Sequence, residues 1–504
     1  MFSRTPRTLK DLLLACSMSH LMMAQAWFSI LFDRDQGYFN HLRVTPVVLF
    51  SLIASLGLLT IPLFLAIRYW RRHATRVHQT VMAVIALLCL VPPVNFVRYN
   101  FCGLQAGVIY KWVSSPVFLV VLLVAGAVVL VRPHWVARLC KAFSVILLPL
   151  AVVSMARIIL VLLGLQRIHQ HAGEVAARAP RLASDPAAPR VVWIIFDELD
   201  RRVTFEDRPD QVSLPQLDLF RAGALDCSQA FPPAQGTALS LPALLCGKPV
   251  IRVEPRNASE LNLAFSEEGP WEGWTDQPTV LSLAREAGFN CGVVAWYHPY
   301  DRLFSRYLTE CFCHPFPAFE QARGRTFGEC MGNQIFSMIS PVQQRRLAIR
   351  LHRESTEEAC RLVADAGLGL VFLHLQGPHR PGIFDRDKQT YTWKSFSIVR
   401  EYLDNLALTD LTLGRIRDSM EKAGLWDSSW VLLSADHRWR EAHVFDGRSD
   451  MRVPFLIKPP GETWSGHLDK TMNTVLTRDL ILAMLRREIK GGPDAADWIV
   501  QRSH

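Results

Sequence analysis

The feature that most constrains the fold is the uneven distribution of apolar residues along the chain. Half of the 504 residues are hydrophobic, and the excess lies within the first 165. Runs of this kind need an apolar solvent, and only helices or closed barrels satisfy the backbone hydrogen bonds inside a bilayer. Residues 1–165 are therefore predicted to form a transmembrane domain. Its five predicted helices cover about 11–32, 45–67, 78–97, 115–131 and 142–164.

Basic residues indicate how these helices cross the membrane. Arginine and lysine are frequent before the first predicted helix, after the second and after the fourth, and sparse in the other two loops. Because positively charged loops stay in the cytoplasm, the pattern predicts a cytoplasmic N-terminus. Five spans then place the C-terminal part outside the cytoplasm, which for a bacterial inner membrane is the periplasm. An even number of spans would reverse that side.

Two further parts follow the predicted membrane domain. Residues 166–189 are rich in Arg, His, Ala and Pro and are predicted to form a linker near the membrane surface. Residues 190–504 are predicted to form one large catalytic domain. The net charge of +9 does not indicate nucleic-acid binding, because much of the arginine lies in short loops between apolar segments and no nucleic-acid motif accompanies it.

Short apolar runs alternate with helical patterns after residue 190. The predicted strands are 191–196, 290–296, 369–375, 430–434 and 453–458, and the predicted helices are 214–223, 239–246, 280–287, 341–366, 396–423 and 476–485. Residues 251–275 are predicted to be irregular, and residues 297–335 to be rich in loops. The alternation predicts an α/β/α sandwich with a mostly parallel sheet.

Three of the predicted strands end on acidic or histidine side chains. Asp197 and Glu198 follow the first strand, His379 follows the third, and Asp436 and His437 follow the fourth. Because parallel strands bring their carboxyl ends to one edge, these side chains are expected to converge. Carboxylates and imidazoles together suit zinc or another divalent cation.

Thr237 supplies a hydroxyl at the start of a predicted helix, forty residues after Asp197. A threonine hydroxyl is a weak nucleophile, and metal coordination activates it by lowering its pKa. This combination suits phosphoryl transfer through a phospho-threonine, with His379 holding anionic oxygens or protonating the leaving group. The predicted metal ligands are Asp197, Glu198, Thr237, Asp436 and His437; whether Glu198 joins Asp197 on the metal is left open.

Three other histidines are weaker candidates for the substrate side of the site. His374 lies within an apolar strand and fits a core position as well as a functional one. His298 precedes Pro299, and His443 lies just beyond the Asp-His pair; both fit structural roles equally well. Ser240 is the alternative nucleophile, but its place in the first turn of the predicted helix favours a structural role.

These motifs resemble those of the alkaline phosphatase superfamily, in its sulfatase-like branch. The matching segments, in order, are 194–198, 237–247, 377–381, 435–437 and 452–454. With several membrane helices in front, the chain resembles the bacterial phosphoethanolamine transferases of the inner membrane. The resemblance implies Thr237 as nucleophile, Asp197, Asp436 and His437 as metal ligands, and His379 near the phosphate.

The resemblance also implies a reaction and its cofactor. A phosphoethanolamine-like group would pass from a phospholipid to Thr237 and then to a lipid-linked glycan such as lipid A or a core oligosaccharide. The cofactor would be a divalent metal, zinc first, with manganese, magnesium or calcium as alternatives. The segments Phe196-Asp197-Glu198 and Asp436-His437-Arg438 differ from that family's usual motifs, which leaves the donor head group and the acceptor open.

Other functions use the same residues. A membrane-anchored phosphatase, phosphodiesterase or sulfatase-like hydrolase would use water as the acceptor. Thr237, Leu239 and Leu241 argue against sulfate ester hydrolysis, because sulfatases carry Cys or Ser, then Pro, then Arg at these positions. A catalytically inactive scaffold is the third alternative, and the complete residue set argues against it. Several membrane helices favour a lipid substrate, because one would suffice as an anchor.

Seven cysteines after residue 190 are expected to include disulfide pairs in an oxidising compartment.

Overall fold

The computed structural model describes residues 7–32, 38–39, 44–72, 75–100, 116–166, 177–314, 322–461 and 464–503. The chain divides into two compact units, a helical unit and a sheet unit. The helical unit comprises Met1–Arg34, Leu42–Gln170 and Ala318–Gln344, and the sheet unit comprises Asp35–His41, His171–Pro317 and Arg345–His504.

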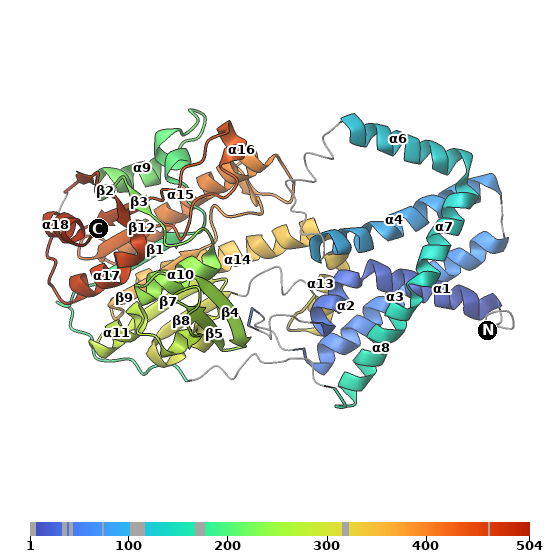
Figure 1. Cartoon of the computed structure of the whole chain (residues 1–504), viewed down its shortest axis with the longest axis horizontal. Helices are drawn as coiled ribbons and strands as arrows, with labels where there is room; N and C mark the ends of the chain where they lie inside the picture. Colours follow the sequence, from blue (N-terminus) through green and yellow to red (C-terminus); the bar gives the residue numbers. More distant parts are fainter. Residues whose placement is uncertain are drawn as a thin grey trace. The chain divides into compact units, whose positions relative to one another are not determined.

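The helical unit is built from the apolar N-terminal segments and one later insertion. Its helices are α1 (Arg7–Met22), α2 (Ala24–Leu31), α3 (Pro46–Arg72), α4 (Arg76–Asn100), α6 (Pro116–Val131), α7 (Pro133–Ile146) and α8 (Leu148–Leu162). The insertion carries α13 (Phe327–Phe336) and the short 3₁₀ helix Ser337–Ile339, and α14 (Ser340–Val363) leads from it into the sheet unit (Figure 1). Gln334 of α13 hydrogen-bonds to Ser51 and Ser55 of α3.

Three helices of the described chain are long and apolar enough to cross a membrane, namely Pro46–Arg72, Arg76–Val97 and the joined Pro133–Leu162. The protein is therefore membrane-anchored. Helices α1 and α2 meet at 71° and provide a fourth candidate if they form one span. The predicted number of five is not confirmed, and the predicted loop at 132–141 is wrong, because Pro133 begins a helix there. Arginine and lysine favour helix, so a basic segment need not be a loop.

The sheet unit contains an eight-stranded sheet in the order β14-β2-β13-β12-β1-β9-β7-β8. Its central strands β12, β1, β9, β7 and β8 are parallel, and the antiparallel β13 joins them to β2. The strands are β1 (Val191–Phe196), β2 (Leu225–Cys227), β7 (Cys291–Trp296), β8 (Glu310–His314), β9 (Leu370–Leu375), β12 (Trp430–Ser434), β13 (Phe455–Lys458) and β14 (Gly466–Leu468). The predicted mostly parallel sheet is confirmed.

Two hydrophobic cores lie on the two faces of this sheet. Side chains of β1 alternate between them, with Trp193 and Ile195 in one core and Ile194 and Phe196 in the other. This alternation follows from the two-residue period of a strand, and it explains why β1 is apolar throughout. The first core takes in residues of α10 (Thr237–Cys246), α11 (Val280–Glu286), α17 (Thr477–Leu485) and α18 (Gly492–Arg502), and the second takes in residues of α9 (Pro215–Ala222), α14 and α15 (Ile398–Lys422) (Figure 1).

Two segments predicted as irregular or loop-rich have regular structure. Residues 251–275 contain a small antiparallel sheet of β4 (Arg252–Asn257), β5 (Glu260–Ala264) and β6 (Glu272–Gly273). Residues 297–335 contain α12 (Tyr300–Leu303), β8 and α13. The strands were missed because their polar, half-exposed faces leave few apolar residues to reveal the period.

The expected disulfide pairs are not found among the described cysteines, all of which are free thiols. The parallel register explains part of this. Cys311 and Cys313 of β8 lie opposite Val293 and Ala295 of β7, so neither is opposite Cys291.

Candidate active site

Asp197 lies at the carboxyl end of β1, between the neighbouring strands β9 and β12. Its backbone N–H donates to the Leu375 carbonyl at 3.0 Å, which continues the ladder with β9 by one residue. The carboxylate is fully buried, and its Oδ1 has no hydrogen-bond partner among the described residues. A buried carboxylate oxygen without a donor is costly unless something else binds it.

Thr237 is the first residue of α10, on the core face that also holds Ile195. Its Oγ1 lies 3.4 Å from Asp197 Oδ2 and 3.2 Å from His437 Nε2. The helix begins at this residue, so the N-terminal amides surround the place where the hydroxyl is held. Ser240, the alternative nucleophile, instead donates to the Ala234 carbonyl at 2.9 Å.

Asp436 and His437 follow β12 and reach the same point. Asp436 Oδ1 accepts the backbone N–H groups of His437 at 2.9 Å and of Glu198 at 3.3 Å. The other oxygen, Oδ2, has no hydrogen-bond partner among the described residues and lies 3.4 Å from His437 Nε2. His437 Nδ1 is 2.9 Å from the Arg438 carbonyl, which leaves Nε2 as the atom that faces the carboxylates and Thr237.

His374 joins this cluster from within β9. It pairs in register with Ile195, and its Nε2 lies 3.5 Å from Asp197 Oδ2. Ligand atoms of Asp197, His374 and Asp436 all lie within 4.8 Å of one another. His374 Nδ1 is buried and has no hydrogen-bond partner in the described structure.

The charged groups of the cluster shift one another's pKa values. Burial works to raise the pKa of Asp197, but His379, His374 and His437 lower it below the usual range of an aspartate. Burial and the negative charge of Asp197 raise the pKa of Asp436. Burial works to lower the pKa of His437, but the two aspartates outweigh it and raise that pKa.

Glu198 and His379 form a rim above the cluster through Arg440. Glu198 has a left-handed backbone (φ 64°), and its Oε1 accepts a 2.5 Å hydrogen bond from Arg440 Nε. Arg440 Nη2 is 3.0 Å from His379 Nε2, and half of the arginine side chain is exposed. The structure therefore adds a cation at the open side of the site. The only sequence signal for it is the basic segment after His437.

His298 lies on the far side of Thr237 and is fully buried. Its Nδ1 is 2.9 Å from the Tyr38 hydroxyl, and its Nε2 has no hydrogen-bond partner among the described residues. Burial and the nearby His374 lower the pKa of His298 to about 3, so the ring is neutral. Tyr38 is also fully buried, and its carbonyl accepts a hydrogen bond from Arg302. A residue from between the first two predicted membrane helices thus supports the histidine behind Thr237.

His443 is not brought into the cluster. It is exposed at the start of the short helix α16 (His443–Asp446), and no contact with the buried carboxylates occurs among the described residues.

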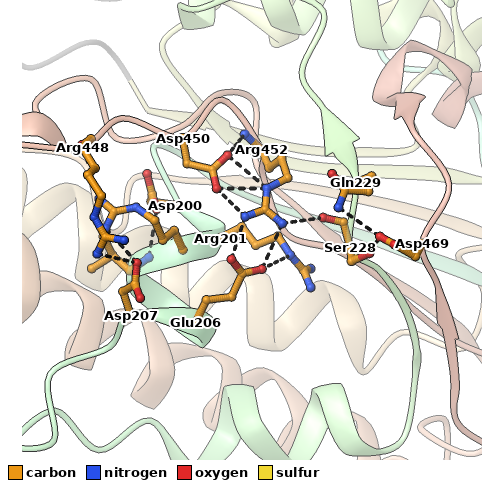
Figure 2. Close-up of polar contacts among 12 residues, drawn as sticks. Asp200, Arg201, Glu206, Asp207, Ser228, Gln229, Arg448, Asp450, Arg452 and Asp469 are labelled. Atoms are coloured by element: carbon orange, nitrogen blue, oxygen red, sulfur yellow. Dashed lines mark hydrogen bonds and ion pairs between the residues drawn. The ribbon is translucent and has the colours of Figure 1, made fainter.

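Ion pairs connect the two loops that carry Asp197 and Asp436. Arg452 Nη2 lies 2.6 Å from Glu206 Oε2, and Arg448 Nη2 lies 3.0 Å from Asp207 Oδ2. Figure 2 shows these pairs, with the residues after β1 facing the residues that precede β13. Because both loops are fixed to each other, the distance between the two aspartates is held by more than the sheet.

The residue set fits a divalent cation. Four buried atoms, Asp197 Oδ1, Asp436 Oδ2 and both ring nitrogens of His374, have no hydrogen-bond partner in the described structure. Two carboxylates and imidazole nitrogens form the mixed O/N donor set that zinc and manganese accept. A cation would also remove the repulsion between two buried carboxylates.

A mostly parallel sheet with carboxylates, imidazoles and a hydroxyl at its carboxyl edge is the arrangement expected of an enzyme of the alkaline phosphatase superfamily, and a family match supports that class. Members of this class use divalent metals. A sequence model of the sulfatase family matches residues 189–477, more than half of the chain, and the chain belongs to that family.

Individual relatives are distant. An arylsulfatase from Volvox carteri is 34% identical over 84 residues, which make up 15% of this chain and only 13% of the relative's length. The phosphonate monoester hydrolase of Agrobacterium radiobacter has 13% identity and a TM-score of 0.41, over 59% of this chain and 74% of that one. The lipoteichoic acid synthase LtaP from Listeria monocytogenes has 14% identity and a TM-score of 0.37, over 59% of this chain and 72% of that one.

Proposed function

We propose that this protein is a membrane-bound, metal-dependent transferase. It moves a phosphoethanolamine-like group from a phospholipid, through a phospho-threonine at position 237, to a cell-envelope glycan or lipid such as lipid A or core oligosaccharide. The catalytic domain would lie on the periplasmic side of a bacterial inner membrane. The membrane anchor supports a lipid donor, because both the enzyme and the donor then share one surface.

The observation that carries the proposal is the position of the Thr237 hydroxyl. It is held within 3.4 Å of Asp197 and within 3.2 Å of His437, at the N-terminus of α10. A hydroxyl at that position forms a phosphate ester directly, without the oxidised side chain that sulfate ester hydrolysis uses. This supports phosphoryl over sulfuryl chemistry.

The side chains divide the work of the first half-reaction. Asp197, His374, Asp436 and His437 would hold the metal, zinc in the first instance. When bound, a divalent metal lowers the pKa of the hydroxyl beside it and neutralises phosphate oxygens. Thr237 Oγ1 then loses its proton to water and forms a bond to phosphorus, and the bond from phosphorus to the glycerol oxygen of the donor breaks, with the glycerol oxygen taking a proton from water.

Residues at the rim serve the leaving and arriving groups. His379 Nε2 accepts a hydrogen bond from Arg440 Nη2 at 3.0 Å, because a guanidinium can only donate. Once released from that contact, the same nitrogen can take the proton of the acceptor hydroxyl that attacks the phospho-threonine and pass it to the departing Thr237 oxygen. Arg440, whose side chain is half exposed, offers a cation for the phosphate oxygens.

The test is direct detection of the modified threonine. Purified protein is incubated with phosphatidylethanolamine and zinc, digested, and the peptide containing Thr237 is analysed by mass spectrometry. The wild-type peptide is expected to carry phosphoethanolamine, Thr237→Ala to carry none, and the matched control Ser240→Ala to be modified as the wild type is. An unmodified wild-type peptide, together with envelope lipids unchanged by loss of the protein, would overturn the transferase.

The hydrolase remains the second candidate because it shares every residue named above. The two are separated by omitting the acceptor. A hydrolase releases free phosphoethanolamine continuously under these conditions, whereas a transferase releases at most one equivalent of diacylglycerol per enzyme, frees no phosphoethanolamine and leaves the threonine modified.

A further inference from the structure

Basic side chains from three helices of the helical unit line one small cavity. Lys10 of α1, Arg71 of α3 and Lys141 of α7 lie around this cavity, which has a volume of about 170 Å³. Arg71 Nη2 forms an ion pair with Asp11 Oδ1 at 2.7 Å, and that carboxylate is buried. The arginine charge is therefore compensated within the protein, and the two lysines supply the remaining positive charge of the cavity.

The helices around the cavity offer no carboxylate to these lysines. In residues 7–32 and 44–166 the sole Asp or Glu is Asp11, which already pairs with Arg71. Lys10 and Lys141 thus lie at the end of a helix bundle without an acidic partner from α1, α3 or α7. Basic pockets between membrane helices bind the anionic head groups of lipids.

The inner wall of the cavity is apolar and joins α1 to α7. Leu14, Val145 and Leu148 line it. Ser17 Oγ donates to the Ser144 carbonyl at 2.5 Å, two turns along α1 from Lys10 and one turn along α7 from Lys141. Cations at one side and aliphatic side chains at the other match a charged head group that is attached to hydrocarbon.

A larger apolar cavity adjoins this wall within the same unit. Leu13 and Leu148 line both cavities, so these side chains stand between them. The larger cavity has a volume of about 530 Å³, and its lining along α8 extends from Leu148 to Ile159. Those eleven steps correspond to roughly 16 Å at 1.5 Å per residue, which accommodates most of an acyl chain. A ligand held by the lysines therefore has an apolar path for its hydrocarbon.

We propose that the basic cavity binds an anionic glycerophospholipid, with its phosphodiester on Lys10 and Lys141 and an acyl chain directed past Leu13. Charge complementarity selects this occupant over a zwitterionic lipid, because an ethanolamine ammonium would cancel the negative charge that the lysines lack. The predicted topology places this end of the bundle at the cytoplasmic leaflet. The site is separate from Thr237 and does not depend on the proposed transfer reaction.

The test measures lipid binding without turnover. Full-length Thr237→Ala protein is stripped of lipid in detergent and incubated with palmitoyl-oleoyl phosphatidylglycerol, with the matching phosphatidylethanolamine or with dioleoylglycerol, and bound lipid is counted by native mass spectrometry. Phosphatidylglycerol is expected to bind about tenfold more tightly than phosphatidylethanolamine, and dioleoylglycerol more weakly than either. Water-soluble glycerophosphoglycerol at the same concentration is expected to displace no lipid, because it lacks the hydrocarbon.

Charge-matched pairs of variants locate the bound lipid. Lys10→Gln combined with Lys141→Gln is expected to weaken phosphatidylglycerol binding about thirtyfold, at roughly 1 kcal/mol for each cation. Lys10→Arg combined with Lys141→Arg keeps the charge and is expected to keep the affinity. Arg7→Gln combined with Arg138→Gln removes the same charge from α1 and α7, but neither arginine lines the cavity, so binding is expected to be unchanged.

Four results would overturn the proposal. They are equal affinity for phosphatidylglycerol and phosphatidylethanolamine, wild-type affinity in the glutamine variant of the two lysines, an equal loss in the arginine control, and displacement of the lipid by glycerophosphoglycerol. The last result would assign the cavity to a soluble phosphate ester.

Discussion

Replacing Asp436 with asparagine should stabilise the metal-free protein and remove most of its response to metal. Asp197 and Asp436 present ligand atoms within 4.8 Å of each other in a fully buried site. Two unit charges at that distance repel by roughly 3 kcal/mol at an effective dielectric constant of about 20. Favourable interactions of Asp197 with His379, His374 and His437 offset part of this, so a net gain of about 1–2 kcal/mol is expected in the absence of metal.

The substitution preserves the local hydrogen bonds. Asp436 Oδ1 accepts two backbone N–H groups, and the asparagine Oδ1 can accept both. The amide nitrogen takes the place of Oδ2, which has no described hydrogen-bond partner and lies 3.4 Å from His437 Nε2. The new N–H can donate to that nitrogen or to Asp197. The variant therefore removes a charge without leaving a cavity or a new unsatisfied group.

The pH dependence of stability also indicates that the ionised Asp436 destabilises the metal-free fold. Burial and Asp197 raise the pKa of Asp436 in the folded state. The folded protein therefore holds the proton more tightly than the unfolded chain, and stability falls as pH rises from the ordinary aspartate value towards the raised one. The penalty grows through that interval, and the amide removes it.

The assay is tryptophan fluorescence during heating, with chelator and then with zinc. In chelator, Asp436→Asn is expected to melt a few degrees above wild type, at about 2–4 °C per kcal/mol. Zinc at about 100 times its dissociation constant adds roughly 2.7 kcal/mol to the wild type and much less to the variant. Asp410→Asn, a buried aspartate on α15, serves as control and keeps the full zinc response. A wild-type melting temperature indifferent to chelator, or a variant less stable than wild type in chelator, would refute the reasoning.

Three other perturbations follow from the contacts of the sheet unit. Arg201 and Asp226 are both buried and form a bidentate ion pair, which Arg201→Met removes. The free energy of unfolding, measured by chemical denaturation, is expected to fall by about 3 kcal/mol. Adding Asp226→Leu is expected to recover most of that loss, because no unpaired charge then remains buried. Burial raises the pKa of Asp410 to about 6, so ionisation of this carboxyl destabilises the folded state as pH rises from about 4 to 6. Asp410→Asn is expected to be more stable than wild type by about 1–2 kcal/mol above pH 6 and equally stable at pH 4. A difference in stability that does not change with pH would contradict this. Tyr38→Phe leaves His298 Nδ1 without its 2.9 Å partner; a loss of about 1–2 kcal/mol and slower modification at Thr237 are expected, and an unchanged rate would show that the support is only structural.

Local sequence pattern was enough to locate the sheet and one side of the site. The strands β1, β9 and β12 are short, mostly apolar runs; Asp197 follows β1 directly, and Asp436 follows β12 after Ala435. A strand buried on both faces must be apolar throughout, and its first polar residue marks the edge. Applying that rule needs only residues that are adjacent in the chain, so the ends of these strands can be located from the sequence alone.

The count of membrane spans did not follow from the same kind of reasoning. Hydropathy locates apolar runs, but α7 and α8 join at Leu147 into one 30-residue candidate, and α1 meets α2 at 71°. Whether a break is a loop, a kink or a continuous helix depends on packing around it. The same holds for α13, a segment far along the chain that packs on α3.

What the sequence alone determined is the identity of the chemical groups, namely a threonine, two aspartates and histidines at the ends of parallel strands. What only the tertiary structure decided is which of them meet. His374 looks like a core residue in its strand, and it becomes part of the cluster because β9 pairs with β1 in a register that sets it opposite Ile195. Tyr38 and Arg440 reach His298 and His379 from distant segments. Such contacts depend on strand order and on loop paths, which are properties of the whole fold and not of any local pattern.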